Sequence, residues 1–166
     1  MLEAKQTMTN QVVQPYKGNP ELGHLSTPIS DSAFVRTFIN ALPAYRKGMA
    51  PITRGLEIGL AHGYFLVGPE IVVGALRDYK AAPYIGGLVT AIALVLIGTA
   101  GMGAHGLVSL KPATELEPGT DPLKTSEGWS EMTAGFFLGG MSGAYMAYLL
   151  LSHFAEIDAI FRGFVN

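Results

Sequence analysis

Cysteine is absent from the 166 residues of this chain, and charged residues make up only 14% of them. The first absence excludes disulfide bonds, thiolate metal sites and cysteine nucleophiles. The second contrasts with the roughly 25% of charged residues in a typical soluble domain. The net charge of −2 gives no basis for binding nucleic acid. Because HExxH, P-loop and GxSxG patterns are also missing, we expect that the protein is not an enzyme.

Hydrophobic residues are abundant instead. They make up 49% of the chain, the mean hydropathy is +0.31, and there are 21 glycines. This balance is typical of an integral membrane protein. The first ten residues, MLEAKQTMTN, have neither the apolar core of a signal peptide nor the Arg- and Ser-rich composition of a transit peptide. We therefore expect the protein to be made in the compartment where it enters the membrane.

Three apolar segments are each longer than the roughly 20 residues that cross about 30 Å of hydrocarbon. The first should kink or end at Gly68-Pro69. A polar arm, with a short helix near residues 31–41, precedes them, and a polar loop before the third segment carries Trp129 as an anchor at the membrane surface. We predict an all-α membrane protein with an N-terminal arm (1–50) and a three-helix transmembrane domain (51–166), whose spans lie at about 54–76, 84–110 and 132–154.

Lys and Arg residues predict the orientation of the chain. Eight of them lie in the N-terminal arm, at the start of the first span or in the loop at residues 111–131, and three lie on the opposite side. Because positively charged segments stay in the cytoplasm, we expect the N-terminus on the cytoplasmic side and the C-terminus across the membrane.

Glycines recur at four-residue spacing in two of the predicted spans. The two stripes are Gly55, Gly59 and Gly63 in the first span and Gly135, Gly139 and Gly143 in the third. Such stripes let backbones or flat ligands approach a helix closely. Two interpretations stay open: packing between helices of this chain, or a surface that receives other subunits or cofactors.

Two polar residues, Glu57 and His62, interrupt the apolar sequence of the first span. A charged group at mid-membrane costs roughly 2.5–3.5 kcal/mol on insertion scales, so each residue needs a partner. On an ideal helix the two side chains point about 140° apart, which excludes a shared metal or an acid–base pair. One alternative is structural, with Glu57 paired to Arg54 and His62 bonded to a neighbouring helix. The other is axial ligation of two separate metal macrocycles.

His105 in the second span suggests a specific alternative. At 1.5 Å per residue, His105 lies roughly 7.5 Å and His62 roughly 12 Å below the cytoplasmic edge of its own span. A haem held by two histidines requires such a similar depth on adjacent helices. His153 lies near the far edge, where contact with water explains it better. Transport is not favoured, because the second and third spans lack acidic residues for a relay and no inverted repeat is visible.

Long stretches of the chain resemble one family. NPELGHLSTPISDS, LPAYRKGMAPITRGLEIGLAHGYFLVGPE and DPLKTSEGWSEMTAGFFLGG are similar to the cyanobacterial form of photosystem I reaction centre subunit XI, also called subunit L. The similarity extends from about Val13 to Asn166. It implies a three-span accessory subunit of the thylakoid membrane that binds chlorophyll a and beta-carotene, contacts the large core subunits and mediates formation of a trimer.

The resemblance also implies roles for particular residues. Glu57 and His62 match positions that hold chlorophyll magnesium, and His105 is a further candidate ligand on the grounds of its depth alone. Asp78, with the carbonyl of Ala75, lies in a turn that is near a calcium site in some members. For the trimer contact we expect the glycine stripe of the third span and the apolar C-terminal stretch AIFRGFVN.

Overall fold

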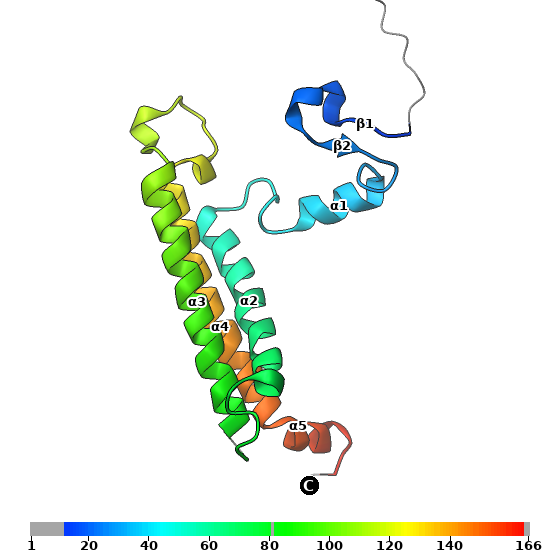
Figure 1. The fold of residues 1–166 in the computed structure, drawn as a ribbon, viewed down its shortest axis with the longest axis vertical. Helices are drawn as coiled ribbons and strands as arrows, with labels where there is room; N and C mark the ends of the chain where they lie inside the picture. The colour runs from blue at the N-terminus through cyan, green and yellow to red at the C-terminus, as the bar shows by residue number, and fades with distance from the viewer. Residues whose placement is uncertain (1–11, 81, 165–166) are drawn as a thin grey trace, which may run out of the picture. The chain divides into compact units, whose positions relative to one another are not determined.

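The computed structural model describes residues 12–80 and 82–164, and the chain divides into two compact units, residues 1–47 and 48–166. In the first unit, β1 (Gln14–Pro15) pairs antiparallel with β2 (Leu25–Ser26). Two short 3-10 turns, η1 (Tyr16–Gly18) and η2 (Pro20–Leu22), connect these strands. The helix α1 (Ala33–Ala41) follows them and matches the short helix that the sequence predicts near residues 31–41 (Figure 1).

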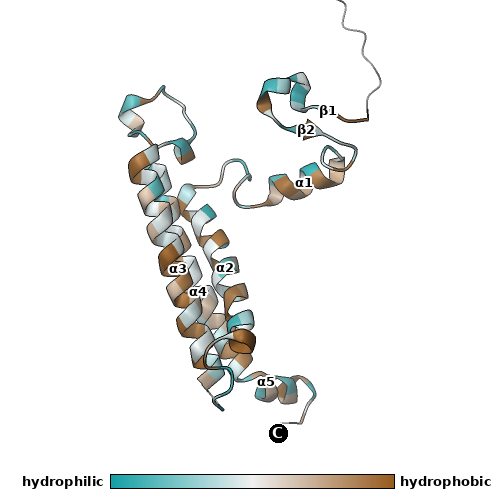
Figure 2. Ribbon diagram, in the orientation of Figure 1, coloured by the Kyte–Doolittle hydropathy of each residue, from teal (hydrophilic) through white to brown (hydrophobic). Residues whose placement is uncertain are grey.

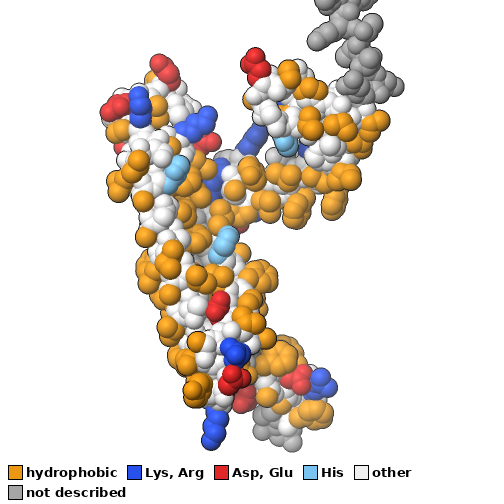
Figure 3. Space-filling model, in the orientation of Figure 1, with side chains coloured by type: hydrophobic (Ala, Val, Ile, Leu, Met, Phe, Trp, Pro, Cys, Tyr) orange, Lys and Arg blue, Asp and Glu red, His pale blue; other side chains and the backbone are white. Residues whose placement is uncertain are grey.

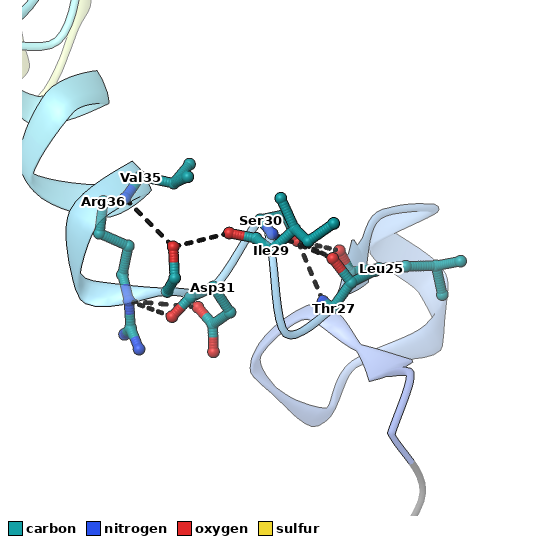
Figure 4. A network of polar contacts seen from close by, with 8 residues as sticks. Leu25, Thr27, Ile29, Ser30, Asp31, Val35 and Arg36 are labelled. Carbon is teal, nitrogen blue, oxygen red and sulfur yellow. Dashed lines mark hydrogen bonds and ion pairs between the residues drawn. The ribbon is translucent and has the colours of Figure 1, made fainter.

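A network of polar contacts fixes the start of α1 (Figure 4). The Ser32 hydroxyl accepts from the backbone N–H of Val35 at 3.2 Å and donates to the carbonyl of Ile29 at 2.8 Å. The guanidinium of Arg36 donates to the carbonyl of Asp31 at 2.9 Å and lies 3.4 Å from its carboxylate. A serine in this position satisfies one of the N–H groups that a helix start leaves without a partner.

The second unit contains three long helices. They are α2 (Pro51–Val73), α3 (Ala82–Ser109) and α4 (Ser126–Ser152), and each is long and apolar enough to span a membrane. The predicted fold class is therefore confirmed. Two 3-10 turns, η3 (Ala113–Glu115) and η4 (Pro122–Lys124), lie between α3 and α4, and a short helix, α5 (Phe154–Phe161), follows α4.

The ends of the three helices lie within three residues of the predicted span boundaries, except at the start of α4. Pro69 does not end α2, which continues to Val73, because one missing backbone N–H is tolerated inside a long membrane helix. In addition, α4 begins at Ser126, six residues before the predicted start. The buried hydroxyl of Thr125 accepts from the backbone N–H of Gly128 at 3.0 Å and caps this earlier start, so polar residues assigned to the loop form the first turns of the helix.

The glycine stripes of α2 and α4 pack against each other. A Cβ added to Gly59 would clash with the backbone of Phe136 and Gly140, and one added to Gly139 would clash with the backbone of Leu56 and Leu60. The other four glycines of the two stripes, Gly55, Gly63, Gly135 and Gly143, are equally close to the facing backbone. Successive glycines of α2 face successively higher residue numbers of α4, so the two helices run parallel. The first and third spans of a bundle whose helices alternate in direction must do so.

Packing inside the chain therefore explains both stripes, and the alternative of a glycine surface open to subunits or cofactors is wrong. Small residues allow this approach where lipid provides no hydrophobic force between helices. The third helix, α3, covers one side of the pair, and a core of small and branched side chains joins the three: Val67, Leu88, Ala91, Ala144 and Ala147.

The outer surface of the helical unit is apolar. Figure 2 shows hydrophobic residues along the lengths of α2, α3 and α4, and in Figure 3 most charged side chains of this unit lie near its two ends. Several large side chains on these helices are more than half exposed, among them Phe65, Ile97 and Leu138. Such a surface is stable against lipid tails or other apolar membrane subunits.

Candidate functional site

His62 lies at the middle of α2, eleven residues from either end of the helix. Its Nδ1 is 2.7 Å from the carbonyl oxygen of Ile58, one turn earlier. Because a carbonyl oxygen only accepts, Nδ1 must donate and therefore carries a proton. In a neutral imidazole the lone pair is then on Nε2, which is the atom that a metal would bind.

The surroundings of His62 are apolar and open. A cavity of about 290 Å³ is lined by Ala61, His62, Phe65 and Leu66, and the imidazole is exposed. The ring also makes an edge-to-face contact with Phe136 of α4, with 5.7 Å between ring centres. The imidazole is thus held by its own helix and by α4 while it faces an apolar space. The room for a flat ligand comes from this outer surface and not from the glycine stripe.

Glu57 lies six residues after the start of α2 and is half-buried. Arg54, one turn earlier, is buried, and its Nε donates to the carbonyl of Met49 at 3.1 Å. Within residues 12–80 and 82–164, no group of three or more His, Cys, Asp or Glu side chains converges on a point that could hold a metal ion. Glu57 and His62 lie five positions apart on α2, which corresponds to about 140° around an ideal helix.

His105 packs against Trp129. Their ring centres are 4.9 Å apart, and the indole N–H of Trp129 donates to the carbonyl of Met102 at 2.7 Å. Gly106 makes room for the indole, since an added Cβ would lie 2.6 Å from its Cδ1 atom. Trp129 belongs to α4 and not to the preceding loop, so its hydrogen bond joins two spans. The sequence pattern does not predict this contact between α3 and α4, because it depends on which helices are neighbours in the folded chain.

The geometry disfavours a haem held by two histidines. His62 lies against Phe136 and His105 against Trp129, and these two aromatic residues are seven positions apart on α4. At 1.5 Å per residue this is about 10.5 Å along the helix axis. Two axial ligands of one iron must face each other at the same level. His153, the last candidate, lies at the end of α4, where its Nδ1 is 3.1 Å from the carbonyl of Leu149.

The proposed calcium ligands do not form a site by themselves. Asp78 and Ala75 lie in the exposed turn between α2 and α3. The carboxylate of Asp78 is 3.6 Å from the Nε of Arg77, with which it forms an exposed ion pair. Calcium takes six to eight oxygen ligands, and this turn supplies one carboxylate that a cation already accompanies. Within the described part of the chain, this turn therefore lacks the oxygen ligands that a calcium ion needs, and another chain would have to supply them.

Three long apolar helices, packed through glycine stripes and able to span a membrane, define a small multi-span membrane protein. Residues 12–156 match the family described as photosystem I reaction centre subunit XI, and the chain belongs to this family. It is 57% identical to photosystem I reaction center subunit XI of Synechocystis sp., over 95% of this chain and 98% of that protein. The protein of the same name from Thermosynechococcus vestitus is 54% identical, over 96% of this chain and 100% of the relative. The protein of the same name from Trichodesmium erythraeum is 58% identical, over 93% of this chain and 94% of the relative.

Proposed function

We propose that this chain is a pigment-binding subunit of photosystem I and that His62 ligates the magnesium of a chlorophyll a molecule through Nε2. The observation that carries this proposal is the 2.7 Å contact between Nδ1 of His62 and the carbonyl of Ile58. It fixes the tautomer, orients the ring and leaves one nitrogen lone pair directed away from the helix backbone. Bound chlorophyll absorbs light and passes excitation energy to neighbouring pigments.

Glu57 is the proposed ligand of a second chlorophyll. A carboxylate is a hard oxygen ligand that suits magnesium, and the partial positive charge of the metal offsets the cost of placing the carboxylate inside a span. Because Glu57 and His62 point about 140° apart on α2, the two rings lie on different sides of the helix. The exposed apolar side chains of the spans offer a surface for beta-carotene, a long apolar molecule without a group that needs ligation.

Pigment counting tests these ligands. We would purify photosystem I that contains His62→Leu, Glu57→Leu or the control His153→Leu, and measure chlorophyll per photochemically active reaction centre. Each of the first two variants should lose one chlorophyll, while the control should keep all of them because His153 lies at the end of its span. Unchanged pigment content in His62→Leu complexes would refute ligation by Nε2. Glu57→Gln keeps an oxygen ligand and should retain its pigment more weakly.

The second proposed role is assembly of a trimer, for which α5 and the residues after it are the better candidates. The stripe of Gly135, Gly139 and Gly143 is occupied by α2, so it is not available to another copy. By contrast, three large side chains of α5 and its extension are strongly exposed: Ile160, Phe161 and Phe164. An apolar segment of this kind needs a partner surface, and a head-to-tail contact around a threefold axis closes into a ring. The last two residues of the predicted tail, Val165 and Asn166, lie outside the described residues.

The location and orientation follow from the same proposal. We place the chain in the thylakoid membrane, in contact with the large core subunits, with its N-terminus on the cytoplasmic side and its C-terminus in the lumen. The excess of Lys and Arg on the N-terminal side supports this orientation. Calcium at Asp78 and Ala75 remains a prediction that requires oxygen ligands from another chain, and it predicts that chelation removes the ion from the intact complex.

A further inference from the structure

A third polar position lies on the membrane-facing surface, at the end of the bundle where α2 meets α3. A groove of about 390 Å³ lies between the last turns of α2, the turn that follows and the first turns of α3. Its walls include the apolar side chains of Leu76, Ile85 and Val89, together with the polar residues Glu70 and Thr90. Mostly apolar concave surfaces with a few polar groups are the usual form of a small-molecule site.

Glu70 has no partner within this part of the chain. The residue is half-buried, and no hydrogen bond or ion pair to its carboxylate occurs among residues 12–80 and 82–164. Two cations lie in the turn. Arg77 accompanies Asp78 at 3.6 Å and donates to the carbonyl of Gly74 at 3.2 Å, and among the described residues no ion pair joins Lys80 to Glu70. Glu70 lies three residues before the end of α2, about 4.5 Å inside the helix. An acidic residue at this depth, beside an apolar groove, indicates a ligand or partner from outside the chain.

Thr90, on the α3 side of the groove, differs in its hydrogen bonding from Thr99 of α3 and Thr133 of α4. The hydroxyls of Thr99 and Thr133 donate to carbonyls four residues earlier, each at 2.8 Å. Within the described residues the hydroxyl of Thr90 makes no such bond. The groove therefore offers one carboxylate and one hydroxyl donor, and neither is used by the protein that surrounds it.

We propose that this groove binds a third magnesium tetrapyrrole, with Glu70 as the axial oxygen ligand and Thr90 as a hydrogen-bond donor to a carbonyl group on the edge of the ring. The proposal rests on the pigment-binding function proposed above. The magnesium of such a ring accepts a further ligand, and a carboxylate is a suitable hard oxygen donor. Thr90 then gives the ring a fixed orientation, because two polar contacts at separate points of a flat molecule define its rotation.

The pigment at Glu70 is distinct from the one at His62. The two residues are eight positions apart on α2, which corresponds to about 12 Å along the axis and about 80° around it. One magnesium cannot reach both side chains. The groove also has its own walls from the turn and from α3, whereas the cavity at His62 is lined by residues of α2 alone.

The test uses intact photosystem I with the variants Glu70→Leu, Glu70→His and Thr90→Val. Glu70→Leu should lower the chlorophyll count by one per complex, while Glu70→His should retain the pigment because an imidazole can also supply the one axial bond of a metal macrocycle. Thr90→Val should keep the count but raise the stretching frequency of one ring carbonyl in resonance Raman difference spectra, since a hydrogen bond is lost. A density map of the unmodified complex with a ring magnesium next to the Glu70 carboxylate would show the ligation directly.

The outcomes separate this proposal from the one on which it rests. If His62→Leu complexes lose a chlorophyll and Glu70→Leu complexes do not, the site at Glu70 is refuted and the pigment-binding function stands. If neither variant loses a pigment, both proposals fail. If Glu70→Leu and Glu70→His lose the same pigment, Glu70 acts by a contact other than ligation, and the proposal is overturned. A density map with a lipid headgroup or another subunit's side chain at Glu70 would overturn it as well.

Discussion

Substitution of Gly59 by alanine tests the parallel contact between α2 and α4, which organises the membrane unit. An added Cβ would clash with the carbonyl of Phe136 and the backbone N–H of Gly140. Because backbone atoms cannot rotate away as a side chain does, the two helices must separate along part of their length. Overpacking of this kind costs about 1–3 kcal/mol. Alanine also favours a helix over glycine by about 0.5–1 kcal/mol, so the observed loss is smaller than the clash alone.

Gly101→Ala is the matched control. Gly101 lies inside α3, and an added Cβ would have no neighbouring atom within 4 Å. This variant gains the same helix propensity without a clash, so the difference between the two variants isolates the packing cost of about 1–3 kcal/mol. The assay is unfolding of the full chain in mixed mild and denaturing detergent micelles, followed by the helical circular dichroism signal. Equal stability of Gly59→Ala and Gly101→Ala would refute the close approach of α2 and α4.

Three further predictions concern other contacts. Trp129→Phe keeps an aromatic ring but removes the 2.7 Å hydrogen bond to Met102, and it should lower the unfolding free energy by about 0.5–1.5 kcal/mol in the same assay; an unchanged value would mean that this bond does not join α3 and α4. A third ligand at His105 predicts that His105→Phe complexes lose one chlorophyll, whereas an unchanged count would assign His105 to packing against Trp129. Replacing Phe161 and Phe164 by serine should convert trimers of the complex to monomers in size analysis under mild detergent, with light-driven charge separation retained in each monomer; persistent trimers would contradict the assembly role of α5.

Much of the fold can be read from the sequence because the membrane constrains it strongly. Hydrocarbon leaves backbone groups no partner except each other, so an apolar stretch of sufficient length must form a helix. The three spans are predicted on this basis, and α1 lies where the sequence predicts a short helix, near residues 31–41. The start of α4 was missed because the hydrophobic pattern begins after its polar first turns. The cap at Thr125 was the available signal, since a threonine directly before a glutamate-containing turn is typical of a helix start.

The membrane class, the number of spans and the angle between Glu57 and His62 can be predicted without a structure, because they depend on composition, segment length and the 100° step of one helix. How the glycines are used depends on the packing of the helices. Their spacing fits either packing inside the chain or a surface for other molecules, and the choice depends on the register between α2 and α4. The same is true of the histidines. Whether His62 of α2 and His105 of α3 can share a ligand depends on which residues of α4 each one packs against, Phe136 or Trp129. The roles of the two ring nitrogens of His62 depend on the contact with the carbonyl of Ile58, which exists only once the helix has formed and the side chain has taken its rotamer.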